Sequence, residues 1–527
     1  MKKVLKVISI ILAATLIIAV AAAFIIPIYL NEPLKKAFIE EFNQQTEQNY
    51  QLDFADIDVN LFRRSISVDS ISVLPDSTSP HVQQISVASI SVNGISLWSL
   101  FSGSFPDFNS ITVTEPHVEI LERDLSTSLL SGNDSGKSDE ALGDLDTFSL
   151  YIDNGSGTIT TSDGLELFSI SDISLEAENV DVNKLLDGSE LLFMEHLLIQ
   201  GTGVKWNIQK DFYDLTIANF NFDKQAGSFS IANVALTPLL PKYEFSETKG
   251  FQLDRINLEI PALSLSGMDL NSLANEHINV EELTIDQPWM EVFRNKRIDR
   301  REGLNVKPLL NELAHSVDFS IGVNNTTISD ATIIYEEHKA PSDSSAAISF
   351  DDLDATISNI RTVSHPSFSE DTLKLNVETL FMDTAPLTVD VRYPVFNEAD
   401  LHTVKATLGS LNPKVAGNML ERSGFVRVEE GLVESLEAEF ELNSESSSGE
   451  VLILYRDLKI SFLNEDTGEQ GFGEKFKDFI ANTFSIKSDN MEPDPTIGEI
   501  AFEREVEKSI FAYWWKSLLS GIQDTIK

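Results

Sequence analysis

Apolar residues alternate with polar residues along most of the chain. From residue 49 onward, run after run places Ile, Val, Leu or Phe at every second position, with Asp, Ser and Asn between them. A period of two is typical of β-strands, because successive side chains point to opposite faces of a sheet. Turn residues separate the runs. The pattern therefore predicts a mainly β fold, and its first apolar positions are Leu52, Phe54, Ile57 and Val59.

Stretches of this β pattern resemble each other at a nearly constant spacing. Residues 111–121 match residues 283–293, class for class, at an offset of 172, and residues 148–154 answer residues 319–325 at an offset of 171. A fixed spacing indicates a duplicated unit. We therefore expect three β-modules, the last of them a partial copy that does not align: 49–222, 223–400 and 401–485.

Loops and ends of the repeat differ between the copies. Residues 124–146 are rich in Ser, Gly and Asp and predict a mobile loop in the first module. The corresponding place in the second module, 306–316, predicts a short helix. Drift in the loops after duplication explains this difference between a loop and a helix. Beyond it the two copies match again, because residues 173–179 resemble residues 353–359.

The alternation is absent from the first thirty residues. From Val7 to Ile28 the chain has 22 consecutive uncharged positions, which at about 1.5 Å per residue is enough to cross the apolar core of a bilayer. Three lysines precede this run and favour a cytoplasmic amino terminus. We therefore expect residues 1–30 to form a single membrane anchor, with the bulk of the chain exported. A cleaved secretory signal and an inverted topology are the alternatives.

Two further segments have helical rather than strand-like spacing. Residues 31–48 predict a juxtamembrane amphipathic helix directly after the anchor. Residues 486–527 predict a linker and then a C-terminal amphipathic helix, whose apolar face includes Trp514, Trp515 and Leu518. Two interpretations are open for this last helix. It caps the open end of the β-structure, or its paired tryptophans rest on a membrane interface.

Charge and composition narrow the range of functions. The chain has 83 acidic and 39 basic side chains, a formal net charge of −44, and no cysteine. A surface this acidic argues against nucleic acid as a partner and against electrostatic docking to anionic headgroups. The absence of cysteine excludes disulfides, thiolate metal sites and thiol nucleophiles. An exported domain of this composition is held by burial and backbone pairing.

Patterns associated with catalysis are missing from the sequence. The eight histidines are scattered, and no two have the spacing of three or four that a helical metal site needs. No phosphate-binding loop, dinucleotide fingerprint or nucleophile elbow is present. We therefore predict a protein that is not an enzyme and that has no metal site and no cofactor. An anchored hydrolase is the alternative, and it would require a clustered acid/base site.

The apolar face of the predicted sheet needs a cover. A sheet with one apolar face normally packs that face against helices or a second sheet, and predicted helices here are few and short. The remaining choices are a sandwich, a closed barrel, or a curved sheet whose apolar face is shielded by something other than protein. The third choice suits lipid chains.

Several segments resemble one family of envelope proteins. After the membrane helix, residues 50–73, residues 90–103 and the Glu-Pro-His-Val-Glu-Ile strand at 115–120 resemble the start of AsmA-like proteins. Residues 455–462 and 514–521 resemble the end of the related DUF748-type proteins. The resemblance is closest over the first 120 residues. The resemblance is one of residue classes at matching positions and does not involve invariant catalytic residues.

The resemblance implies an inner-membrane protein whose bulk is periplasmic and which contributes to outer-membrane biogenesis. The implied fold is an elongated, curved antiparallel β-sheet of repeated groove modules, between the anchor and the C-terminal helix. The implied ligand is the acyl chains of phospholipids, held in a hydrophobic β-groove. The alternative function is a structural or assembly factor for outer-membrane proteins that carries no lipid.

Alternation alone nominates the floor of such a groove. Each of these residues is equally compatible with the ordinary core of a sandwich. The nominated residues are Ile66, Val68, Ile85, Val87, Ile111 and Val113 in the first copy, and Leu283, Ile285 and Val292 in the second.

Overall fold

The protein is mainly β, as the alternating pattern predicts. The chain divides into two units, Met1–Asn233 and Val234–Lys527, and strand β11 (Ser228–Pro238) spans the division. The computed structural model describes the following residues: 50–60, 62–75, 82–96, 108–122, 147–180, 194, 196–269, 277–303, 306–317, 320–362, 372–463 and 486–527.

Three predicted segments lie outside these residues. They are the membrane anchor from Val7 to Ile28, the juxtamembrane helix at 31–48 and the polar loop at 124–146. Among the helices that are described, none has the length and apolar character needed to cross a membrane.

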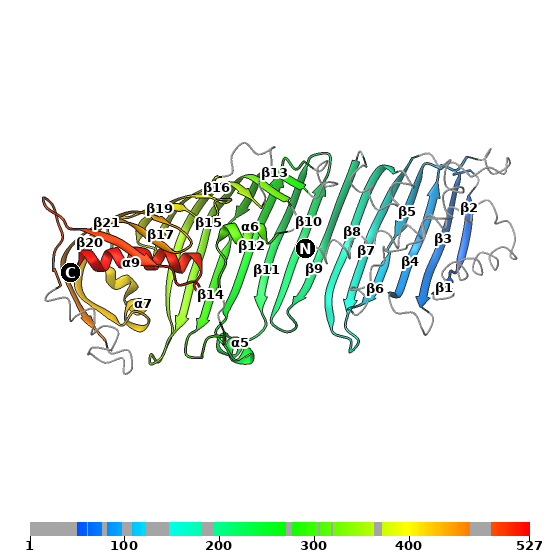
Figure 1. Cartoon of the computed structure of the whole chain (residues 1–527). Coiled ribbons are helices and arrows are strands. Elements are labelled where there is room, and N and C mark those ends of the chain that lie inside the picture. The colour runs from blue at the N-terminus through cyan, green and yellow to red at the C-terminus, as the bar shows by residue number, and fades with distance from the viewer. Residues whose placement is uncertain are drawn as a thin grey trace. The chain divides into compact units, whose positions relative to one another are not determined.

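Unit 1 contains a curved sheet whose strands follow one another in chain order (Figure 1). Its apolar positions alternate along each strand, as in β7, where Leu150, Ile152 and Ile159 are buried. The strands before the division are β1 (Tyr50–Asp53), β2 (Asp56–Asn60), β3 (Ser65–Pro75), β4 (Val82–Asn93), β5 (Ser110–Thr114), β6 (His117–Leu121), β7 (Phe148–Thr160), β8 (Glu166–Val180), β9 (His196–Ile208) and β10 (Tyr213–Asp223).

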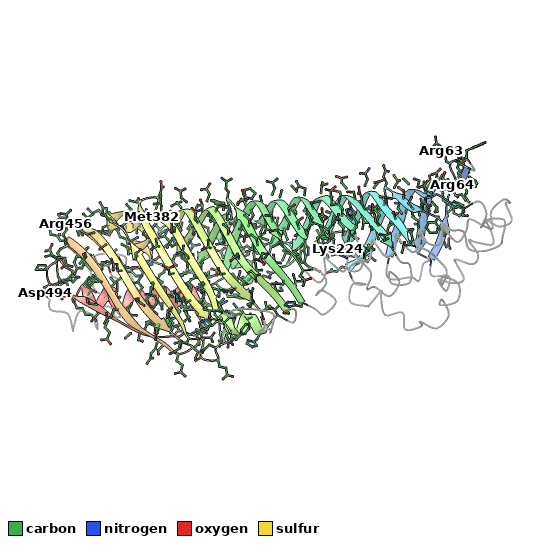
Figure 2. The ribbon with its side chains drawn as sticks, turned by 90° about the horizontal axis from the view of Figure 1, so that it is seen from above. Arg63, Arg64, Lys224, Met382, Arg456 and Asp494 are labelled. Atoms are coloured by element: carbon green, nitrogen blue, oxygen red, sulfur yellow. The ribbon has the colours of Figure 1, made fainter. Side chains whose placement is uncertain are left out.

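Unit 2 continues with strands and adds short helices. The β17–β18 hairpin turns at Met382 and Asp383 (Figure 2), both in the left-handed region of backbone space. The elements are α5 (Lys242–Lys249), β12 (Asp254–Ser266), β13 (His277–Asp286), β14 (Trp289–Asn295), α6 (Leu310–His315), β15 (Ser320–His338), β16 (Ala346–Arg361), β17 (Thr372–Phe381), β18 (Ala385–Pro394), β19 (His402–Leu408), the 3-10 helix η5 (Pro413–Ala416), α7 (Gly417–Arg422), β20 (Val426–Leu442), β21 (Ser446–Phe462), β22 (Ile497–Glu503) and α9 (Ile510–Thr525).

The sheet is mostly antiparallel, as expected, but it also contains parallel pairs, which the prediction did not include. β7 runs parallel to β5 and β6, and β15 runs parallel to β13 and β14. In each unit a proline interrupts one strand. Pro116 separates β5 from β6, which both pair with β7, and Pro288 separates β13 from β14, which both pair with β15. Parallel neighbours require a crossover connection. In unit 2 this connection, between β14 and β15, carries α6, within the stretch where the sequence predicts a short helix.

The same hydrogen bonds surround the two proline breaks. Glu115 donates its backbone N–H to the carbonyl of Asp153 at 2.7 Å, and Gln287 donates to the carbonyl of Ser329 at 2.8 Å. Both donors have a left-handed backbone, with φ of 50°. Unit 1 and unit 2 therefore contain an equivalent broken-strand motif.

The register corrects one of the predicted alignments. Ile111 stands beside Leu150, and its counterpart Leu283 stands beside Thr326. β7 and β15 therefore correspond at an offset of 176, so residues 148–154 do not correspond to 319–325. The error arises because the crossover differs in length between the units, which no local pattern reveals.

Bulges keep the apolar side chains of the long strands on one face. β8 has Asp172 and β16 has Asp352 in the left-handed region, each at an irregularity of the strand register. The extra residue shifts the alternation by one position and increases the local bend of the strand. In β8 the buried residues accordingly change from even to odd numbers, from Ile170 to Ile173 and Leu175.

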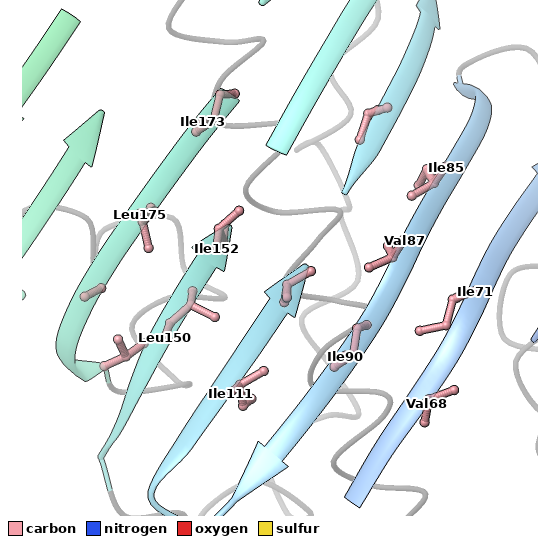
Figure 3. Packing of buried hydrophobic residues seen from close by; sticks show 14 of the residues in the cluster. Val68, Ile71, Ile85, Val87, Ile90, Ile111, Leu150, Ile152, Ile173 and Leu175 are labelled. Atoms are coloured by element: carbon pink, nitrogen blue, oxygen red, sulfur yellow. The ribbon is translucent and has the colours of Figure 1, made fainter. Parts of the chain in front are cut away.

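The core of unit 1 is formed by apolar residues that stand opposite one another on neighbouring strands. One row runs from Val68 through Ile90 and Val113 to Ile152 and Leu175. All five side chains are buried, with at most 6% of their surface exposed. Figure 3 shows these strands with their buried side chains on one side of the sheet. Directly opposed apolar pairs are what stabilise a sheet of this kind.

Helix α9 packs closely on the last strands of unit 2, β21 and β22 (Figure 1). Its buried positions include Ser517 and Gly521, which lie one turn apart. A methyl group on Gly498 of β22 would lie 2.1 Å from the Gly521 carbonyl oxygen, so only glycine permits this approach. Side chains of α9 also accept hydrogen bonds from the outer strand: Ser520 from Ala501 N–H at 3.2 Å, and Asp524 from Glu499 N–H at 3.0 Å.

This contact predicts a large effect of a single methyl group. Gly498→Ala should lower the free energy of unfolding by about 2 kcal/mol, because overpacking displaces α9. Gly417→Ala in α7 is the control, since its methyl group meets nothing within 4 Å and should stabilise by about 0.5 to 1 kcal/mol. Urea unfolding measures both variants. Equal stability of Gly498→Ala and the parent protein would contradict the close packing of α9.

Candidate functional site

The apolar face of unit 2 is continuous from strand to strand. Apolar residues stand opposite one another in the register, whereas the alternate positions on the same strands are mostly polar, such as Thr284 and Asn376. Two rows of directly opposed residues cross the sheet: Leu263, Ile285, Ile328, Ala355, Val377 and Val389 in one, and Leu258, Met290, Ile333, Phe350 and Phe381 in the other.

From β12 to β17 most of this apolar face is half-buried rather than buried. Buried apolar residues form only a small cluster there, made by Ala331, Leu353 and Ala355. We call the half-buried apolar residues of these strands the open face. Its members are Ile256, Leu258, Leu263, Leu265, Leu283, Ile285, Met290, Val292, Ile328, Ile333, Phe350, Ile357, Leu375 and Val377.

The same rows become buried at the C-terminal end of unit 2. Leu375 of the open face stands opposite Val391, which is 2% exposed, and the row continues through Val404 and Phe440. Apolar residues of α6 and α9 pack against this cluster. The change from open to covered therefore follows from the position of the two helices, because the strands are apolar throughout.

Helix α5 packs on the opposite side of the sheet. Its Tyr243 lies edge-on to Phe293 of β14, with ring centroids 5.2 Å apart, and its Lys242 pairs with Glu291 at 2.8 Å. Phe293 and Glu291 alternate with Met290 and Val292 along β14, so they face away from the open face. Helix α5 therefore leaves the open face uncovered.

Charged residues border the open face where β12, β14 and β15 meet. Asp254 and Arg294 stand opposite each other and form an ion pair. Next to them, Tyr335 donates a hydrogen bond at 2.7 Å to Glu337, which also pairs with Lys296. Burial favours a raised pKa for Glu337, but the Lys296 ammonium and hydrogen bonds outweigh it and lower that pKa. The border therefore stays ionised and polar beside an apolar floor.

A buried histidine fixes α9 over the covered end. The indole N–H of Trp514 donates to His402 Nε2 at 3.0 Å, and His402 Nδ1 lies 2.7 Å from the Asp400 carbonyl oxygen. Because an indole only donates, Nε2 is the acceptor and the proton is on Nδ1. Tyr393 stacks on the imidazole at 4.4 Å. Burial lowers the pKa of His402 and favours this neutral form.

The nominated residues of the first copy lie in the buried core of unit 1. They share exposures of 7% or less, so in the structure they contribute to packing. This group comprises Ile66, Val68, Ile85, Val87, Ile111 and Val113.

The nominated residues of the second copy lie together on the open face. Leu283 and Ile285 of β13 are near neighbours of the same face, and Val292 of β14 lies beyond the break at Pro288. On α9, Trp514 and Leu518 pack against the core, whereas Trp515 is 54% exposed. The helix therefore covers the sheet, and an interfacial role for Trp515 stays a prediction.

Because bulges shift the alternation, the sequence pattern alone assigns some residues of the open face to the wrong side of the sheet. Alternation counted from Ile328 assigns Ile333 to the opposite face, but the irregularity at Asp330 returns it to the same one. Phe350 and Ile357 are related in the same way across Asp352. The usable signal is an Asp that interrupts an otherwise regular apolar alternation.

The described residues hold no group of three or more His, Asp or Glu side chains that could bind a metal ion. Models of known protein families give no match to this chain, and curated protein sequences give none either.

Burial in unit 1 and exposure in unit 2 predict unequal effects of the same substitution. Val87→Asp should lower the free energy of unfolding by about 4 kcal/mol, because it buries an unpaired charge. Val292→Asp, on the open face, should lower it by about 1 kcal/mol, because water still reaches the carboxylate. Urea unfolding compares the two, and equal losses would show that the open face is buried in solution.

The neutral state of His402 predicts a pH dependence of stability. Below about pH 6.5 this histidine binds a proton in the unfolded chain but not in the folded protein. The free energy of unfolding therefore decreases as the pH is lowered, by up to about 1.4 kcal/mol per pH unit. His402→Gln should reduce this slope. His315→Gln, at an exposed position of α6, is the control and should keep it. Thermal unfolding between about pH 7 and pH 5 measures the slopes. An unchanged slope in His402→Gln would contradict the assignment.

Proposed function

We propose that this protein is a membrane-anchored, periplasmic AsmA-like protein that shields or transfers lipid acyl chains. In this proposal the open face forms the floor of a hydrophobic β-groove. The observation that carries it is the row of opposed apolar residues from β12 to β17, which is left half-buried while its continuation is covered by helices. Contiguous apolar surface that stays accessible marks a binding site.

The dimensions of the open face suit an acyl chain. The open face crosses five neighbouring strands, from β12 to β17, if the two pieces β13 and β14 are counted as one strand. At a spacing of about 4.8 Å between strands, the five span about 19 Å. One leaflet of a bilayer core is about 15 Å deep, which is the length that one acyl chain spans. Each methylene group moved from water to this face contributes about 0.8 kcal/mol. An acyl chain that lies across the rows of apolar residues is therefore bound without any polar contact.

The border of the open face supports an amphipathic ligand. Acyl chains need an apolar floor, and the headgroup of the same lipid needs polar surroundings. The ion pair of Asp254 with Arg294 and the group around Glu337 provide such surroundings beside Val292 and Tyr335. In the proposal, anchoring by residues 1–30 brings this arrangement to the inner membrane, and the chain works as a binding protein with no cofactor.

A pair of adjacent substitutions tests the proposal. Ile333 and Ile334 are both half-buried, and they face opposite sides of β15. Ile333→Glu places a charge on the open face and should reduce co-purifying phospholipid about tenfold or more, since an acyl chain bound there would remove the carboxylate from water. Ile334→Glu is the matched control and should keep its lipid. Mass spectrometry of the gently extracted full chain measures the bound lipid.

The outcomes separate lipid binding from the alternative function. Circular dichroism tests whether both variants fold, and a photo-crosslinking residue at position 328 identifies what contacts the open face. Lipid adducts at position 328, lost on competition with added phospholipid, support the proposal. Adducts with outer-membrane proteins in a lipid-free chain would replace it with an assembly factor. Equal lipid content of the two variants would also reject it.

A further inference from the structure

Basic side chains gather in one part of unit 2, although the chain as a whole is strongly acidic. Residues 294–307 contain six basic and two acidic residues, and residues 504–516 contain three and two, in a protein of net charge −44. Nine basic side chains against four acidic ones is the reverse of the overall balance. Net charge alone therefore conceals two segments in which basic residues outnumber acidic ones.

Backbone and side-chain contacts bring these two segments together. The backbone N–H of Lys307 donates to the Val506 carbonyl at 2.8 Å, and the Arg504 guanidinium donates to the Lys307 carbonyl at 2.7 Å. Arg300 lies 4.0 Å from Glu507. The crossover after β14 and the approach to α9 therefore form one surface, which we call the basic cluster: Lys296, Arg300, Lys508 and Lys516.

The charges of the basic cluster are incompletely compensated. Lys296, Arg300 and Lys516 pair with Glu337, Glu507 and Glu505, but among the described residues the ammonium of Lys508 has no hydrogen-bond or ion-pair partner. Burial, with the positive charges of Arg300, Lys516 and Lys296, lowers the pKa of Lys508 to about 8. A half-buried cation among like charges is a place where an anion is stabilised.

Apolar groups flank the basic cluster on two sides. On α9, Phe511 is 70% exposed and Trp515 is 54% exposed. They are four positions apart and so lie on one side of the helix, and Lys508 lies two residues before the helix begins. On the other side, the cluster starts at the end of β14, four residues after Val292 of the open face. A ligand that joins an anionic group to an apolar body matches both features.

We propose that the basic cluster binds the phosphate of a glycerophospholipid whose acyl chains lie on the open face. Arg300 donates two parallel N–H groups that fit two phosphate oxygens, and Lys508 supplies a compact charge. Phe511 and Trp515 contact the glycerol and the first methylene groups, as aromatic side chains do at membrane interfaces. This inference rests on the proposed function and adds to it a separate site for the phosphate group of the lipid.

The test compares lipids that differ only in the phosphate. The full chain, held in an amphipathic polymer, is titrated with dihexanoyl phosphatidic acid, with dihexanoylglycerol and with inorganic phosphate. In the parent protein phosphatidic acid should bind about tenfold more tightly than dihexanoylglycerol, the gain from one or two charged hydrogen bonds. Arg300→Gln with Lys508→Gln should abolish the difference and leave dihexanoylglycerol binding unchanged.

A control with the same charge change keeps the test specific. Arg456→Gln with Lys459→Gln removes one Arg and one Lys from exposed positions of β21, and Arg456 is labelled in Figure 2. This variant should bind phosphatidic acid as the parent protein does. Loss of the phosphate preference in the control as well would overturn the site, because it would show a general effect of charge.

The remaining outcomes distinguish this inference from the function on which it rests. Equal binding of phosphatidic acid and dihexanoylglycerol to the parent protein overturns the phosphate site and leaves the open face intact. The absence of binding by either lipid overturns both proposals. If inorganic phosphate binds as tightly as phosphatidic acid and dihexanoylglycerol does not bind, the basic cluster is a site for free phosphate and not for a lipid headgroup. Both double variants are checked by thermal unfolding.

Discussion

The structure depends on apolar residues standing opposite one another across neighbouring strands. In each unit the register brings Ile, Val, Leu and Phe into rows perpendicular to the strands, and each pair removes apolar surface from water. Such rows require a cover on their outer side. In unit 2 the helices α6 and α9 cover only the later strands. The candidate site is the part of the rows that lies beyond these helices.

Bulges allow this arrangement in long strands. β15 has 19 residues and β16 has 16, so a regular strand of this length would carry its twist through the whole sheet. The left-handed Asp330 and Asp352 interrupt the alternation and return the apolar side chains to the same face. Asp tolerates this backbone region better than the β-branched residues around it.

The sequence predicts the β class, the short helix at α6, the C-terminal helix and the equivalence of residues 111–121 with 283–293. Alternation is a local signal and is strong in this chain. It cannot predict the parallel pairing of β15, because that depends on a crossover whose direction no neighbouring residue encodes. It places Leu283, Ile285 and Val292 on the open face, but it does not separate them from Val87, because exposure depends on which elements pack above each strand. The contact of Trp514 with His402 joins residues 112 positions apart, and no periodicity reports it.

The hydrogen bonds from α9 to β22 affect how the protein behaves among other chains. β22 pairs with β21 on one side, and among the described residues no strand pairs with its other side. An outer strand with unpaired N–H groups is a template on which a strand of another molecule can add. Ser520 and Asp524 occupy the N–H groups of Ala501 and Glu499. One helix thus shields the apolar face and occupies two N–H groups at that edge. Together with the exposed Glu499 and Glu503 of β22, it disfavours self-association by edge pairing.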